Sequence, residues 1–126
     1  MNEYHGFISR LSSELAPGSL IIDCHSFPSD LADIYIDICI GYNDDASKPE
    51  QEMIDKATHL FDRAGFKVGL NNPYSNSITP KKPIDYKSLM IEVNKRCYMN
   101  EGTLARTVGY DIISGLVNDF YRLVLA

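Results

Sequence analysis

A chain of 126 residues is long enough for a single domain with its own core, and its hydrophobic content of 44% and charged content of 23% are ordinary for a globular protein. The formal net charge of −5 argues against nucleic acid as a partner, because basic residues cluster only at Lys81-Lys82 and Lys95-Arg96. No apolar run approaches the ~20 residues of a membrane span, so we expect no membrane partner.

The three cysteines indicate a reducing compartment. Cys24 and Cys39 lie inside apolar, strand-like runs, and Cys97 follows a third such run, which is how reduced core thiols are distributed. An odd count without a C-x-x-C pair argues against a disulfide framework and against a structural zinc knuckle. The start of the chain has no basic region followed by an apolar one. We therefore expect a single domain over residues 1–126, located in the cytoplasm.

The first predicted elements are a helix and a strand. Residues 3–15 carry apolar side chains at steps of three and four and are followed by Pro17-Gly18, a pattern typical of a helix and its end. Residues 20–28 begin with three aliphatic residues, a pattern that predicts a buried strand. Alternation along this strand places Asp23 and His25 on one face and Cys24 on the other. Asp23 can therefore orient His25 for metal binding or proton transfer, whereas Cys24 cannot pair with it.

The middle of the chain predicts a strand, a helix, a second strand and a loop. Isoleucines occupy every second position of residues 33–41, as in a strand with one buried face. A helix is expected from residue 49 to about residue 64, started by a capping box of Ser47 and Glu50 and ended by Gly65. Residues 66–70 predict a short strand, and residues 71–80, rich in Asn, Ser and Pro, predict a loop.

The last predicted strand contains a carboxylate. In residues 88–94, Leu89, Ile91 and Val93 share one face, and Met90, Glu92 and Asn94 share the other. Because a buried carboxylate is costly, Glu92 is either functional or salt-bridged, for example to Arg96 or Lys95. A final helix is expected from about residue 103, with apolar residues at intervals of four. This order of elements predicts a three-layer α/β fold with a mixed sheet and helices on both faces.

Four segments in this order resemble the N-formylglutamate amidohydrolase family. They are Asp-x-His-Ser-x-Pro at 23–28, Asp-x-x-Ile-Gly at 37–41, Asn-x-Pro-Tyr-Ser-x-Ser-Ile-x-Pro at 71–80 and Met-Ile-Glu-Val-Asn-x-Arg-x-Tyr-Met at 90–99. That family is similar in fold and chemistry to zinc carboxypeptidases and aspartoacylases, so the resemblance implies a zinc-exopeptidase-like fold.

The resemblance also implies an activity: zinc-dependent hydrolysis of an N-acyl amino acid, such as N-formyl-L-glutamate to formate and glutamate. It implies that His25 is a zinc ligand, that Asp23 holds its tautomer and that Glu92 is the catalytic acid/base. Arg96 is the natural partner of a substrate carboxylate. The candidates for substrate binding are Asn71, Tyr74, Ser75, Ser77, Asn94 and Arg96.

The chain also departs from this family. Members are longer, and their first half supplies the remaining metal ligands, so we expect this chain to begin after that region. His5 is a possible second ligand, and Lys95 stands where the family usually has Arg. Two hypotheses follow. The first is an enzyme whose site is completed by homo-oligomerisation or tolerates fewer ligands. The second is a non-catalytic remnant that serves as a binding domain.

Overall fold

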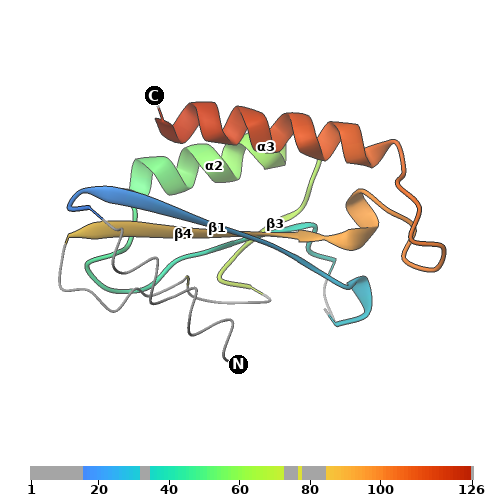
Figure 1. Ribbon diagram of the computed structural model, residues 1–126, viewed down its shortest axis with the longest axis horizontal. Helices are drawn as coiled ribbons and strands as arrows, with labels where there is room; N and C mark the ends of the chain where they lie inside the picture. Colours follow the sequence, from blue (N-terminus) through green and yellow to red (C-terminus); the bar gives the residue numbers. More distant parts are fainter. Residues whose placement is uncertain (1–15, 32–34, 73–76, 78–84, 126) are drawn as a thin grey trace.

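The computed structural model describes residues 16–31, 35–72, 77 and 85–125, and within them four strands form one sheet with two α-helices on one side (Figure 1). The strands are β1 (Ser19–Phe27), β2 (Ile38–Gly41), β3 (Val68–Leu70) and β4 (Tyr86–Asn94). The helices are α2 (Gln51–Arg63) and α3 (Gly109–Leu125). Two short 3-10 turns, η1 (Ser29–Leu31) and η2 (Lys95–Cys97), follow β1 and β4. The predicted helix over residues 3–15 lies outside the described residues.

The sheet is mixed, as the sequence predicts. Its strand order is β1-β4-β2-β3, with β1 parallel to β4, β4 antiparallel to β2, and β2 parallel to β3. Both described helices cover the same face of this sheet (Figure 1). A helical layer on the opposite face therefore stays a prediction. No helix of the described residues is long and apolar enough to cross a membrane.

The main core lies between the sheet and the helices. Phe61 of α2 and Phe120 of α3 are fully buried, and their ring centroids are 6.5 Å apart. Burying each phenyl ring stabilises the fold by roughly 1.5–3 kcal/mol. The other members of this core are Ile38, Ile40, Ala57, Leu89, Ile91, Val93 and Ile113.

A smaller apolar cluster lies on the sheet face away from the helices. It consists of Phe27, Cys39 and Met90, which come from three different strands. Cys39 is fully buried, and so are its neighbours Ile38 and Ile40, whose side chains belong to the other core. The predicted buried isoleucine face is confirmed, and the face that carries Cys39 is buried as well, because β2 lies between β4 and β3 inside the sheet.

The predicted capping box of α2 is wrong. The N-cap residue is Glu50, which makes no side-chain capping bond. Ser47 instead donates its hydroxyl to Asp45 Oδ1 at 2.6 Å and accepts a hydrogen bond from Asn43 Nδ2 at 3.1 Å. The hydroxyl of Ser47 therefore stabilises the turn before the helix. The predicted end is confirmed: Gly65 follows α2 with a φ of 94°, which favours glycine.

Helix α3 begins six residues later than predicted, at Gly109. Residues before it form a turn in which Asn100 Oδ1 accepts hydrogen bonds from the N–H groups of Gly102 and Thr103. The four-residue spacing is also misleading, because each step advances by about 40° more than one full turn, so six such positions cannot share one face. Accordingly, Ile112 is 53% exposed, whereas the neighbouring Ile113 is buried.

Two glycines at α3 offer a matched test of this packing. A Cβ atom at Gly109 would clash with the carbonyl oxygen of Cys97, whereas a Cβ atom at Gly115 would meet no atom within 4 Å. We expect Gly109→Ala to lower the free energy of unfolding by about 1–3 kcal/mol. We expect Gly115→Ala to raise it by about 0.5–1 kcal/mol, because alanine has the higher helix propensity. Urea denaturation measures both values; equal effects would contradict the close contact between η2 and α3.

Candidate active site

The candidate site is built on the pairing of His25 with Glu92. In the parallel register of β1 and β4, these two residues are direct partners. Side chains of paired residues project to the same face of a sheet, and neighbouring strands lie about 4.8 Å apart. Because Ile91 and Val93 pack against the helices, the alternation along β4 directs Glu92 to the opposite face. The structure therefore places the imidazole and the carboxylate side by side on the face away from α2 and α3.

The other face of β1 confirms the predicted alternation. The Sγ atom of Cys24 lies 3.2 Å from the Oη atom of Tyr121, which belongs to α3. Cys24 therefore faces the helices, and His25 faces the other way. The sequence prediction that Cys24 and His25 do not pair is confirmed.

Asp23 fixes the imidazole of His25. The Oδ1 atom of Asp23 lies 2.8 Å from the Nε2 atom of His25, two residues along the same strand. The side chain of Asp23 is 22% exposed and that of His25 is 52% exposed, so the ring lies at the surface but is held from one side. Because Nε2 is paired with Asp23, Nδ1 is the ring nitrogen of His25 that can bind a metal ion or accept a proton.

The pKa of the Glu92 carboxyl is raised above its ordinary value. Desolvation by burial is the main cause; the charge of His25 lowers the pKa, and the charge of Asp23 raises it. The apolar cluster of Phe27, Cys39 and Met90 supplies this environment, since Met90 lies two residues before Glu92 and Cys39 is its direct partner on β2. A carboxyl whose pKa lies nearer to neutral can both take up and release a proton during a reaction.

Asn94 and Arg96 hold the turn that follows β4. Asn94 is fully buried; its Nδ2 donates to the carbonyl of Ile36 at 3.1 Å, and its Oδ1 accepts from the N–H of Arg96 at 3.1 Å. The Nη2 of Arg96 lies 3.0 Å from Asp37 Oδ1. Arg96 is thus paired with Asp37 rather than with Glu92. Substrate contacts by Asn94 and Arg96 stay predictions, and both side chains already serve the turn.

Two of the remaining candidates for substrate binding, Asn71 and Ser77, are described, and both bond to groups other than Glu92. Ser77 Oγ lies 2.7 Å from Ser88 Oγ, and the N–H of Ser77 donates to Asn43 Oδ1 at 2.9 Å. Ser88 lies four residues before Glu92, or roughly 13 Å along the strand. Asn71 adopts a φ of 53°, and its Oδ1 accepts a hydrogen bond from the N–H of Tyr42 at 2.9 Å. Tyr74, Ser75 and the possible ligand His5 lie outside the described residues.

The described residues do not complete a metal site by themselves. Within residues 16–31, 35–72, 77 and 85–125, no group of three or more His, Cys, Asp or Glu side chains could hold a metal ion. A catalytic zinc ion needs about three protein ligands, and His25 offers one imidazole nitrogen. The described residues could therefore supply one ligand of a zinc ion, but not the full set of ligands.

Sequence reasoning missed two contacts that shape this end of the sheet. Asp37 receives hydrogen bonds from Arg96 and, at 2.9 Å, from the N–H of Lys67. Glu101 accepts hydrogen bonds from the hydroxyl and the N–H of Ser29, and these bonds lower the pKa of its carboxyl. Asp37 begins one of the quoted motifs, which was the available signal; no pattern in the sequence links Ser29 with Glu101.

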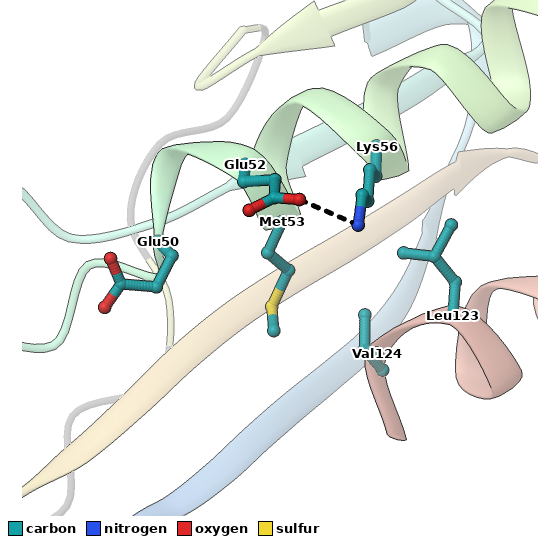
Figure 2. A pocket seen from close by; sticks show the side chains of 6 residues that line it. All are labelled: Glu50, Glu52, Met53, Lys56, Leu123 and Val124. Atoms are coloured by element: carbon teal, nitrogen blue, oxygen red, sulfur yellow. Dashed lines mark ion pairs between the residues drawn. The ribbon is translucent and has the colours of Figure 1, made fainter. Parts of the chain in front are cut away.

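A second concave region lies away from this site. A pocket of about 230 Å³ lies between the start of α2 and the end of α3 (Figure 2). Glu52 and Lys56 form an ion pair at 2.9 Å on its rim, and Met53, Leu123 and Val124 provide its apolar walls. The pocket shares no lining residue with the pair of His25 and Glu92, so we assign it no part in the candidate site.

Comparisons with known proteins agree with the motifs. The family model for N-formylglutamate amidohydrolase matches residues 2–99. The crystal structure of N-formylglutamate amidohydrolase from Ralstonia eutropha JMP134 has the same fold, with a TM-score of 0.64, 24% sequence identity and 86% of this chain covered. The match covers 42% of that chain, so this chain spans less than half of its length. No curated protein matches the chain significantly.

The raised pKa of Glu92 predicts a pH-dependent stability difference. Below the unfolded pKa, near ~4.3, both states are protonated; as the pH rises through the higher folded pKa, the wild type loses stability. Glu92→Gln cannot titrate, so its free energy of unfolding should rise relative to that of the wild type between pH 4 and pH 7. Urea denaturation across this range measures the difference, with Glu52→Gln as the exposed control. A constant difference would contradict the desolvation of Glu92.

Proposed function

Because the chain belongs to the N-formylglutamate amidohydrolase family, we propose that it hydrolyses the N-acyl bond of an N-acyl amino acid such as N-formyl-L-glutamate, releasing formate and glutamate. The observation that carries this proposal is the pairing of Glu92, with its raised pKa, and His25, which is held by Asp23. The proposal concerns the activity of these 126 residues, and this chain spans less than half of the length of the Ralstonia enzyme.

Glu92 has the properties of a general acid/base. In the proposed reaction its carboxylate takes a proton from the attacking water, so that the oxygen can form a bond with the carbonyl carbon of the acyl group. The same carboxyl then gives the proton to the nitrogen as the carbon–nitrogen bond breaks. A raised pKa suits both steps, because the group must be a base in the first and an acid in the second.

We propose zinc as the cofactor, because the family resemblance assigns a metal ligand to His25 and imidazole is a preferred zinc ligand. Zinc would lower the pKa of a bound water and so ease its deprotonation. Among the described residues, His25 would supply one ligand of this zinc ion, and the remaining ligands would have to come from elsewhere.

We propose a second copy of the chain as the source of further ligands. His25 lies on β1, and β1 is the edge of the described sheet. An edge strand can pair with another chain, and such pairing would bring a second set of side chains next to His25. We also propose a cytoplasmic location, which agrees with three cysteines that are all free.

Formate release from N-formyl-L-glutamate with added zinc tests the activity. We expect the wild-type chain to release formate, and Glu92→Gln to be slower by about 10²–10⁴-fold, since the amide cannot exchange the proton. Glu52→Gln, a surface carboxylate paired with Lys56, is the matched control and should leave the rate unchanged. Equal rates for wild type and Glu92→Gln would remove Glu92 from the mechanism. No release by the wild type would favour a non-catalytic binding domain.

Zinc content tests the role of His25 separately from activity. We expect about one zinc per wild-type chain after dialysis, as for a catalytic site. His25→Ala should lose this zinc, and Asp23→Asn should weaken its binding by about 10–100-fold, because Asp23 orients the ring. His59→Ala, which changes an exposed histidine of α2, is the control. Equal zinc contents in wild type and His25→Ala would contradict the assignment.

A further inference from the structure

A pocket of about 200 Å³ lies between the ends of β1 and β4 and the first turns of α3. Its walls are largely carbon: Val93 comes from β4, Tyr98 follows η2, and Tyr110 and Ile113 belong to α3. A cavity of about 150 Å³ is enough to hold benzene in a protein core. The volume therefore fits a phenyl ring or a branched aliphatic side chain.

The pocket walls are held in place by the fold. Val93 and Ile113 are 8% and 7% exposed and belong to the main core. The rings of Tyr98 and Tyr110 pack edge to face with centroids 6.4 Å apart. The guanidinium of Arg106 lies 3.9 Å from the centroid of the Tyr110 ring. Because these four side chains are packed against other groups of the protein, little ordering is needed when a ligand enters.

One residue connects this pocket with the candidate site. His25 lines the pocket and also pairs with Glu92 across the strands. Ser26 and Val93 project towards the helices, whereas the imidazole of His25 projects to the other face. His25 and Val93 lie near the carboxyl ends of the parallel strands β1 and β4, so a ligand held at His25 lies at the same end of the sheet as the pocket.

We propose that this pocket binds an aromatic or branched aliphatic part of the substrate, so that the preferred N-acyl amino acid is apolar rather than acidic. The described side chains that line the pocket are mostly carbon and include no lysine or arginine, so an apolar group gains more from burial there than a carboxylate, which would have to leave water. The nearby Arg96 is already paired with Asp37. This substrate preference rests on the proposed function, but binding at the pocket can be measured without it.

The test compares two ligands that have no amide bond to cleave. 3-Phenylpropionate and succinate differ only in carrying a phenyl ring or a carboxylate at the same position. We expect NMR titration to give a dissociation constant at least about tenfold lower for 3-phenylpropionate, the factor expected when a phenyl ring leaves water. Equal affinities, or a preference for succinate, would overturn the proposal.

A matched pair of variants locates the binding. Ser114→Leu places a larger side chain in the pocket, and Asn118→Leu places the same side chain one turn later on α3, at an exposed position outside the pocket. The preference for 3-phenylpropionate should disappear in Ser114→Leu and persist in Asn118→Leu. If both variants keep the preference, the phenyl ring binds elsewhere and the proposal fails.

The two proposals fail in different ways. Formate release from N-formyl-L-glutamate without any binding of 3-phenylpropionate would overturn the pocket assignment and leave the hydrolase intact. Binding of 3-phenylpropionate at the pocket, without release of formate from either N-formyl-L-phenylalanine or N-formyl-L-glutamate, would support the pocket and overturn the hydrolase.

Discussion

The parallel pairing of β1 with β4 determines where the polar side chains of the candidate site lie. His25 is opposite Glu92 because Leu89, Ile91 and Val93 fix the side of β4 that enters the main core. A slip of one residue in this register would turn one of the two polar side chains towards the helices. Such a slip would also expose core side chains, so the hydrophobic effect holds the imidazole and the carboxylate together.

Burial raises the pKa of Glu92, and the charge of His25 lowers it. The apolar cluster of Phe27, Cys39 and Met90 removes water from this face and so disfavours the charged carboxylate. The charge of His25 partly offsets this cost, while Asp23, which orients the ring, adds to it. The net effect raises the pKa of Glu92, whereas a structural salt bridge would lower it. Arg96, one of the two cations suggested by the sequence for such a bridge, is bound to Asp37 instead.

The sequence predicted best what depends on local alternation. The alternation of side chains along β1 and along β4 follows from the order of residues in each strand, and the observed pairing then places His25 beside Glu92. Prediction from the sequence failed where a tertiary contact overrides a local pattern. Ser47 binds Asp45 and Asn43 instead of capping α2, and α3 begins only at Gly109, after a turn built by Asn100.

Long-range polar contacts could not be predicted from the sequence either. Arg96 carries the same charge whether it meets a substrate or Asp37, and only the fold brings Asp37 within 3.0 Å. Ser77 belongs to a motif that suggested substrate binding, yet it lies beside Ser88 at the opposite end of β4 from Asn94. A motif indicates that its residues share a function, but the strand register determines which of their side chains are in contact.

His25 and Glu92 interact on one face of the sheet, and the pKa of Glu92 measures this interaction directly. Carbon-13 NMR of the side-chain carboxyl should give a pKa above the ordinary glutamate value, and His25→Ala should raise it further, because a compensating positive charge is removed. An ordinary pKa for Glu92 that does not change in His25→Ala would contradict this account.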